Sequence, residues 1–508
     1  AKRLVLPDDR VHLDQIDQPV AVVVLDNRSA EWLAWEGSGR YADAAHGGAI
    51  DGVVTPRQPG SALKPFTYAA AFEQGYHPGR VLADVPSQFP TAEPGILYSP
   101  RNYDDRFRGP LRARLALAGS ENVPAVALAA EVGVPGVARM LRRMGLTTID
   151  RDAAHYGLGL TLGNAEVRLD ELVAAYAALA RGGVHVTPRR VTATDGQPVA
   201  GLRDSERLMS ERTAFWIADI LSDAEARAFV FGRGSSLEFP FAVAAKTGTS
   251  QAYHDNWAIG FTRDVTVGVW VGNFDRTPLR QSSGVTGAGP IFHDVMMAAV
   301  ESIAGTLPVD DHRPIVPPPA DVESREICTV SGLAPQSACR TRVTEWVPVE
   351  TPLERCDWHH DTGGDVLTVW PAEYREWART AGLLEDPVPA GSVRRAAGVP
   401  HLAPAERAET IGRRGRAAGA ADDAKLRLVS PLAGALYLID PSLRPEFQAL
   451  PLRAEGATRG SLEWFVDGEP AGISHADGVL RWPLVRGTHV VRVLDASGRS
   501  AETRFVVR

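Results

Sequence analysis

The stretch that decides the fold is "PGSALKPF", residues 59–66, in which a serine precedes a lysine by three positions. The lysine stands out because only four of the 54 basic residues are lysines, and the rest are arginines. A buried lysine can lose its proton, whereas an arginine stays charged. The use of lysine at position 64 therefore indicates proton transfer rather than positive charge alone.

The spacing of Ser61 and Lys64 places both side chains on one face of a helix that begins near Ser61. A serine hydroxyl is a poor nucleophile until a base takes its proton, and a desolvated lysine can be that base. Pro65 falls in the first turn, where its missing N–H costs little. Because the motif is short, an N-cap serine followed by a solvent-facing lysine is the plain alternative.

Two further motifs follow along the chain, "SEN" at residues 120–122 and "KTGT" at residues 246–249. Serine acyl enzymes that recognise penicillin combine Ser-x-x-Lys, Ser-x-Asn and Lys-Thr-Gly. Two of the four lysines occupy the motif positions that need a lysine, which argues against a chance match. The expected roles are nucleophile for Ser61, base for Lys64, proton relay to the leaving amine for Ser120, substrate orientation for Asn122 and attraction of a substrate carboxylate for Lys246.

The strand that ends in Thr247, Gly248 and Thr249 is expected to bind the substrate. Gly248 would leave room for an acyl-peptide to lie against the strand edge, as in β-strand addition. The backbone N–H groups of Ser61 and Thr249 would form an oxyanion hole.

Strands at both ends of a helical region predict an α+β domain over residues 19–310, with a largely antiparallel sheet. The segment "PVAVVVLDNRSAEWLAWEG", residues 19–37, predicts two strands joined by a polar turn. Alanine- and leucine-rich stretches with helical spacing follow it. Helices are predicted within 61–75, 111–146 and 166–179, and three more strands at 241–250, 256–262 and 265–274.

The rest of the chain changes character several times. Residues 1–18 are interpreted as a linker, and residues 311–385 as a segment rich in proline that holds all three cysteines. Residues 386–425 have almost no aromatic side chains and predict a flexible linker. Short alternating strands with Asp-Gly and Ser-Gly turns predict an immunoglobulin-like β-sandwich at residues 426–508, which we expect to behave as an independent unit.

The three cysteines lie close together in the sequence, at Cys328, Cys339 and Cys356, and His359 follows the last of them. This spacing suits a Cys3His zinc site, with His360 as an alternative ligand. One disulfide with a spare thiol fits equally well. In either case the role would be structural, so we assign no metal and no cofactor to the reaction.

Charge and hydropathy exclude other classes of function. The net charge of −8 argues against a nucleic-acid partner, because such proteins usually present a basic domain or stripe. No apolar run approaches the roughly 18 residues that span a bilayer. The N-terminal stretch "AKRLVLPDD" lacks the apolar region of a signal peptide.

Residues 18–304 resemble the transpeptidase domain of class A penicillin-binding proteins, most closely those of the 1C type. Long segments carry the likeness, among them "YSPRNYDDRFRGPLRARLALAGSENVPAV" and "KTGTSQAYHDNWAIGFTRDVTVGVWVGNFD". The cysteine region, with "EICTVSGLAPQSACR", and the C-terminal "LEWFVDG" and "GTHVVRVLDASGR" resemble later parts of the same type. The middle residue of the second motif, Glu121, departs from the family, which more often has an apolar residue there; we expect its side chain to point away from the reacting centre.

The resemblance implies the penicillin-recognising serine transpeptidase fold and a D,D-transpeptidase that cross-links peptidoglycan stem peptides ending in D-Ala-D-Ala, with β-lactams as inhibitors. Class A members also have a cytoplasmic tail, a membrane helix and a glycosyltransferase domain, which these residues lack. We therefore expect the C-terminal part of a bifunctional protein, located at the periplasmic face and anchored to the inner membrane. The β-sandwich is expected to contact the cell wall or a partner protein.

Two other functions stay open on the residues alone. On the same scaffold, water rather than an amine could take the acyl group, as in a D,D-carboxypeptidase or a β-lactamase. Alternatively, the chain could be a non-enzymatic β-lactam sensor or scaffold. The long multidomain chain favours a synthase over a compact β-lactamase.

Overall fold

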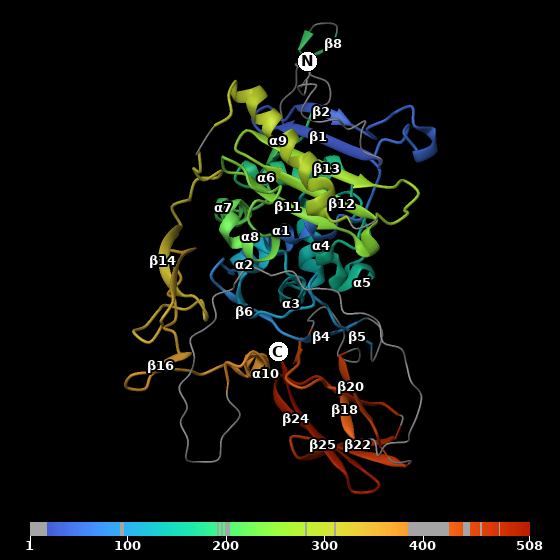
Figure 1. Ribbon diagram of the computed structural model, residues 1–508, viewed down its shortest axis with the longest axis vertical. Helices are drawn as coiled ribbons and strands as arrows, with labels where there is room; N and C mark the ends of the chain where they lie inside the picture. The colour runs from blue at the N-terminus through green and yellow to red at the C-terminus, as the bar shows by residue number, and fades with distance from the viewer. Residues whose placement is uncertain are drawn as a thin grey trace.

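The structure is a computed structural model (Figure 1). It describes residues 18–91, 96–189, 193–194, 197–198, 204–279, 282–308, 311–384, 426–439, 448–457, 460–476 and 478–508. The predicted linker at 386–425 and nearly all of the one at 1–18 lie outside the described residues.

A five-stranded antiparallel sheet forms the centre of the first domain, in the order β11-β12-β13-β1-β2. Val23 of β1 lies opposite Gly268 of β13, and Lys246 of β11 lies opposite Ile259 of β12. The strands predicted at the two ends of the domain therefore meet in one sheet, and β11 forms one of its edges. The strands are β1 (Val20–Asp26), β2 (Trp32–Glu36), β11 (Ala244–Thr249), β12 (Asp255–Phe261) and β13 (Val265–Gly272).

Helices cover both faces of this sheet, with α6 (Leu169–Ala180) on one face and α9 (Gly289–Ala304) on the other (Figure 1). Two glycines let the helices approach closely. A Cβ at Gly268 would lie 2.2 Å from a Val173 methyl of α6, and one at Gly260 would lie 2.7 Å from the Phe292 ring of α9. With helices on both faces, every residue of β12 and β13 is buried, and most of these residues are apolar.

A helical lobe packs beside the sheet around α1 (Lys64–Phe72), which is buried along its whole length. Among the described residues no single helix is long and apolar enough to cross a membrane; α3 and α4 reach that length and composition only as a pair bent by 94°. The other helices are η2 (Ala44–His46), η3 (Gly60–Leu63), α2 (Ala113–Ala118), α3 (Asn122–Val132), α4 (Val134–Arg143), α5 (Ala153–Tyr156), η4 (Gly157–Leu162), α7 (Glu211–Ser222), α8 (Ala224–Phe231), η5 (Gln251–Tyr253) and the π-helix η6 (Gly284–Ala288).

Short strands lie between these helices along the chain, and they form four two-stranded pairs. The pairs are β3 (Val81–Asp84) with β6 (Gly109–Arg112), β4 (Ser87–Pro90) with β5 (Leu97–Tyr98), β7 (Val184–Val186) with β10 (Ser205–Arg207), and β8 (Ala193–Thr194) with β9 (Gln197–Pro198).

Residues 311–384 run down the side of this domain and end beneath it (Figure 1). Glu345 of β15 is buried and accepts hydrogen bonds from Arg112, just before α2, and from Arg114, within α2. This segment is therefore anchored on the helical lobe by buried ion pairs. Its elements are β14 (Val322–Cys328), β15 (Arg342–Pro348), β16 (His359–Asp361), β17 (Val366–Thr368), η7 (Ala372–Tyr374) and α10 (Arg375–Thr380).

The C-terminal region is a β-sandwich with its own apolar core, in which Trp464 is fully buried. One sheet has the order β18-β20-β23, and the other contains β22-β21-β24-β25-β19. The strands are β18 (Arg427–Ser430), β19 (Leu436–Tyr437), β20 (Ala449–Glu455), β21 (Ser461–Val466), β22 (Glu469–His475), β23 (Leu480–Pro483), β24 (Gly487–Asp495) and β25 (Ser500–Val507).

The expectation that this sandwich is an independent unit is wrong in one respect, because its larger sheet continues into the first domain. Strand β19 pairs in parallel with β4, with Leu436 opposite Ser87. Leu438 and Val506 belong to the same apolar cluster as the helical lobe. The edge strand β4 offers free backbone groups for pairing, and no local sequence pattern indicates which distant strand takes them.

Candidate active site

Ser61 lies in a 3-10 turn, η3, that leads directly into α1 at Lys64. The helix was expected to begin near Ser61, and the tighter first turn accommodates Gly60 with a φ of +56°. A Cβ at Gly60 would lie 2.4 Å from the Thr249 carbonyl oxygen. The glycine therefore lets the turn that carries Ser61 lie against the edge strand β11.

Gly248 serves the same close approach rather than leaving room for a peptide. A Cβ at this position would lie 2.0 Å from the Pro59 carbonyl oxygen and 3.1 Å from the Ala62 nitrogen. The expected space beside Gly248 is thus filled by the Ser61 turn. Thr249 remains partly accessible, and its Oγ1 accepts a hydrogen bond from the Gly284 N–H at 2.9 Å.

Lys64 is completely buried at the start of α1 and reaches across to the second motif. Its Nζ donates to Asn122 Oδ1 at 2.7 Å and to the carbonyl oxygens of Ser120 and Glu121 at 2.6 and 3.0 Å. Burial lowers the pKa of Lys64 to about 7, against the opposing negative charges of Glu121 and Asp84. The amine can therefore change its charge near neutral pH.

The three acceptors around Lys64 Nζ match the three protons of an ammonium group. A neutral amine has two protons and one lone pair, so proton loss frees one of these contacts. The Asn122 amide holds its orientation, because its Nδ2 donates to the Arg101 carbonyl oxygen at 2.8 Å and leaves Oδ1 facing Lys64.

Lys246 also contacts the second motif, through the Ser120 side chain. Its Nζ donates to Ser120 Oγ at 2.7 Å and to the Thr247 carbonyl oxygen at 2.8 Å. Burial, followed by the positive charge of Lys64, holds the pKa of Lys246 well below its usual value. Sequence reasoning expected Lys246 to face a substrate carboxylate and did not anticipate its direct contact with the Ser120 hydroxyl.

Ser120 is thus the meeting point of the three motifs. It has a positive φ of +61°, which is uncommon for a residue other than glycine. Its carbonyl oxygen receives Lys64, and its hydroxyl receives Lys246. The fold brings together four of the five side chains expected from the sequence to be catalytic, and the fifth, Ser61, lies in the turn that precedes Lys64. The five are Ser61, Lys64, Ser120, Asn122 and Lys246.

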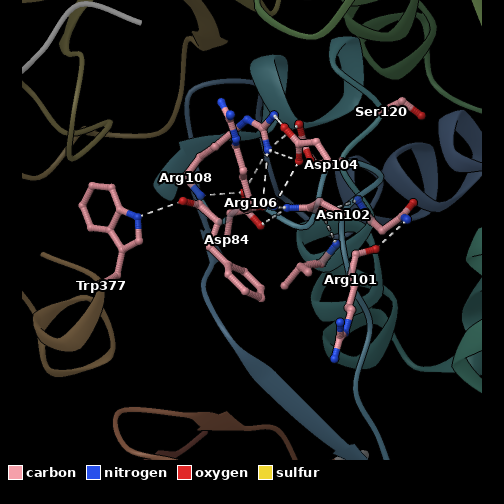
Figure 2. Close-up of polar contacts among 12 residues, drawn as sticks. Asp84, Arg101, Asn102, Asp104, Arg106, Arg108, Ser120 and Trp377 are labelled. Carbon is pink, nitrogen blue, oxygen red and sulfur yellow. Dashed lines mark hydrogen bonds and ion pairs between the residues drawn. The ribbon is translucent and has the colours of Figure 1, made fainter. Parts of the chain in front are cut away.

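A residue that sequence reasoning missed holds the second motif in place. Asn102 Oδ1 accepts hydrogen bonds from the backbone N–H groups of Asn122 and Val123 at 2.9 and 3.1 Å. Its Nδ2 donates to Asp84 Oδ1 and to the Arg106 carbonyl oxygen, both at 2.7 Å (Figure 2). Asn102 thereby satisfies two free N–H groups at the start of α3.

The side chain of Glu121 contacts Arg108, with Oε1 3.1 Å from Nη1, rather than any of the five motif side chains. It is nevertheless buried, and burial raises its pKa to about 8 and that of nearby Asp84 to about 6. Arg108 and the two carboxyl groups therefore form a charged cluster behind Lys64. Trp377 of α10 adjoins it, donating from Nε1 to the Phe107 carbonyl oxygen at 3.0 Å (Figure 2).

Comparisons with known proteins identify the family of this chain. Residues 20–297 match the family model of the penicillin-binding protein transpeptidase domain, and residues 415–505 match the penicillin-binding protein C-terminus family. The chain belongs to the penicillin-binding protein transpeptidase family, and the combination of the two domains is that of the class A, 1C type.

Individual relatives support the same assignment. Penicillin-binding protein 1C of Escherichia coli is 30% identical over 96% of this chain and 61% of its own length. Penicillin-binding protein 1A of Neisseria meningitidis is 29% identical over 56% of this chain and 36% of its own length. The crystal structure of penicillin-binding protein 1A from Haemophilus influenzae has a TM-score of 0.55 at 22% identity, covers 67% of this chain and 55% of its own, and shows the shared fold. The chain thus spans less than two thirds of each of these relatives.

Proposed function

We propose that this chain is a serine D,D-transpeptidase that cross-links peptidoglycan stem peptides and is acylated by penicillins. The observation that carries the proposal is the pair of buried lysines, Lys64 and Lys246, that converge on Ser120 beside the Ser61 turn. Buried unpaired charge is costly, so two such lysines indicate a site kept for chemistry rather than for stability.

Acylation would begin at Ser61, which is partly accessible although the other residues of its turn are buried. Lys64 Nζ takes the proton as the Oγ–H bond breaks and Oγ bonds to the carbonyl carbon of the penultimate D-Ala. The resulting oxyanion would be stabilised by the backbone N–H groups of Ser61 and Thr249. The close packing of Gly60 on Thr249 supports this placement.

Breakdown of this intermediate releases the terminal D-Ala. Its nitrogen takes a proton as the C–N bond breaks, and the Ser120 hydroxyl, held by Lys246 at 2.7 Å, is the proposed relay. An acceptor amine of a second stem peptide then attacks the ester and gives its proton back along the same route. Ser61 regains its hydrogen, and one peptide bond has replaced another.

The substrate-binding role that we propose for Thr247, Gly248 and Thr249 rests on the place of β11 at the edge of the sheet. An extended peptide can add to such an edge through backbone hydrogen bonds. When protonated, Lys246 would contribute positive charge near the substrate carboxylate.

Labelling with a fluorescent penicillin tests the nucleophile. We expect one covalent adduct per chain, located at Ser61 by peptide mass spectrometry and absent in Ser61→Ala. The exposed Ser205→Ala is the matched control and should label like the wild type. Labelling that survives in Ser61→Ala would refute the assignment.

The fate of the acyl group separates transfer from hydrolysis. A transpeptidase should hold a penicilloyl adduct for hours and form cross-linked dimers from a D-Ala-D-Ala stem peptide when an acceptor amine is supplied. Loss of the adduct in well under a second would identify a β-lactamase, and release of D-Ala without dimers would identify a carboxypeptidase. An adduct without any turnover of peptide would support the sensor reading.

Class A members also have a glycosyltransferase domain and a membrane helix. For a longer protein that contains this chain, we propose both activities and a location at the periplasmic face of the inner membrane. The 30% identity to the Escherichia coli 1C protein over most of this chain supports the extension. For the C-terminal sandwich we propose contact with the cell wall or with a partner protein. Co-sedimentation with purified peptidoglycan tests that contact, when the wild-type chain is compared with variants altered in the sandwich.

A further inference from the structure

Four potential metal ligands meet far from the Ser61 site, in the segment that follows the transpeptidase domain. Cys328 ends β14, Cys339 and Cys356 lie in the loops that flank β15, and His359 begins β16. All four residues are buried, and their ligand atoms all lie within 4.8 Å of one another. The fold therefore brings together residues that lie as far as 31 positions apart in the sequence.

The distances among these atoms fit a tetrahedral zinc ion. His359 Nδ1 lies 3.5 Å from the sulfur of Cys328, 3.6 Å from that of Cys339 and 3.4 Å from that of Cys356. Zinc–sulfur bonds of about 2.3 Å and zinc–nitrogen bonds of about 2.0–2.1 Å at a tetrahedral angle place sulfur and nitrogen about 3.6 Å apart. Three nearly equal distances to one nitrogen are what a shared central ion requires.

Hydrogen bonding alone does not account for this arrangement. A neutral imidazole offers one lone pair, at one of its two nitrogens, so at most one thiol could donate to Nδ1. A disulfide would join two of the sulfurs and leave no reason for the third thiol and the histidine to converge with them. All three cysteines are free in the structure.

The surroundings also suit thiolates. The Gln336 N–H donates to the Cys339 sulfur at 3.4 Å, and the Ser331 hydroxyl donates to the Cys356 sulfur at 3.2 Å. The Gln336 side-chain amide donates to the His359 carbonyl oxygen and so fixes the backbone of that ligand. Such outer contacts orient metal ligands and offset the negative charge of three thiolates around one divalent ion.

We propose that Cys328, Cys339, Cys356 and His359 bind one zinc ion as a closed structural site. Four protein ligands leave no open position for a substrate, which distinguishes it from a catalytic zinc site. His360, the alternative ligand, is exposed, and its Nε2 donates to the Asp357 carbonyl oxygen at 2.8 Å instead.

The ion would stabilise residues 323–384, the segment that packs against the region next to the second motif. Strand β15 carries Glu345, which binds Arg112 just before α2 and Arg114 within α2. Farther along, Trp377 packs so closely on Gly109 that a Cβ there would lie 2.5 Å from the indole ring. The site thus stabilises the contacts of residues 323–384 with the loop that holds Arg108, without taking part in the reaction.

Metal analysis of the purified chain tests this proposal. After dialysis against metal-free buffer, plasma mass spectrometry should find about one zinc ion per chain. His359→Ala and Cys356→Ser should retain less than a tenth of that amount, whereas the neighbouring control His360→Ala should retain all of it. Thiol modification of the wild-type chain should release the metal to a chromogenic chelator.

A second measurement needs no variant and so does not depend on variant folding. The wild-type chain reconstituted with Co2+ should show the absorption bands of tetrahedral cobalt with thiolate ligands. Octahedral cobalt spectra, or a wild-type chain that binds no zinc and has the mass of a disulfide-bonded protein, would overturn the proposal. Penicillin labelling at Ser61 is read separately, so failure of the zinc site is distinguishable from failure of the proposed function.

Discussion

The helical lobe around α1 and the C-terminal sandwich bury very different side chains. The lobe encloses Lys64, Glu121 and Asp84 close to one another, together with Lys246 from β11. The sandwich core consists of leucines, valines and aromatic rings around Trp464, with Asp495 as a buried carboxyl that is paired with Arg499. Because burial of charge opposes folding, the difference indicates that the lobe holds groups suited to chemistry at the expense of stability.

The largest effect is expected at the centre of this charged lobe. Lys64→Arg keeps the positive charge but removes a usable base, so penicillin acylation should fall by at least about 10², the typical contribution of a general base. Stopped-flow acylation measures the rate, and circular dichroism confirms folding. Acylation near the wild-type rate in a folded Lys64→Arg chain would move the base elsewhere.

Lys246→Arg is the matched comparison for this change, since its proposed role is electrostatic and Arg also binds carboxylates. Its loss should be smaller than that of Lys64→Arg. Equal losses would mean that both lysines exchange protons.

The next largest effect is expected at Asn102, which holds the second motif in place. Asn102→Ala removes the acceptor for the Asn122 and Val123 N–H groups and leaves Asp84 without its amide partner. Each unsatisfied buried group costs about 1–3 kcal/mol, so the melting temperature and the acylation rate should both fall. Asp105→Asn, at an exposed position three residues after Asn102, is the control. Unchanged melting and acylation in Asn102→Ala would remove Asn102 from the site.

A smaller effect is expected from the cluster behind Lys64. An ionised Glu121 raises the pKa of Lys64, but burial raises the pKa of Glu121 itself to about 8. Because only the ionised fraction acts, Glu121→Gln should lower the pKa of Lys64 only slightly. A lysine that acts as a base is active when neutral, and the acid limb of the acylation profile should therefore move to lower pH. Asp84, Arg108 and Lys246 remain in place, which limits the shift to less than about one pH unit. A shift to higher pH would show that Glu121 does not act on Lys64 through its charge.

The smallest effect on acylation is expected in the sandwich. Leu436→Asp places a carboxylate in the buried contact of β19 with β4 and should lower the melting temperature, because unpaired charge is costly there. Acylation by folded chains should change less than about two-fold, since no motif residue contacts β19. Leu432→Asp, at an exposed position, is the control for both measurements. A large loss of acylation in Leu436→Asp alone would tie the sandwich to catalysis.

The sequence allowed prediction of the parts whose signals are local. Three motifs with fixed spacing indicated Ser61 and Lys64, and alternating apolar runs indicated the strands that form the central sheet. The role of Asn102 was not predictable, because an asparagine in a loop has no pattern that names its partners at Asp84 and Asn122. The pairing of β19 with β4 was missed for the same reason, since it joins segments about 350 residues apart.

Gly248 shows a further limit of prediction from the sequence. Its lack of a side chain was expected to leave room for a bound peptide, and the group that lies against it could not be identified from the sequence. The structure brings the Pro59 carbonyl oxygen to that position, and not an open space for substrate.

The pH dependence of acylation tests the central claim, that Lys64 becomes a neutral base near physiological pH, most directly. Burial lowers the pKa of Lys64 to about 7, so the second-order rate constant for penicillin acylation of the wild-type chain should rise with pH and reach half its maximum near pH 7. Below that pH the amine is protonated and the rate should decline about tenfold per pH unit. A rate that is flat between pH 5 and pH 9, or that rises only near the ordinary lysine pKa of about 10.4, would contradict the account.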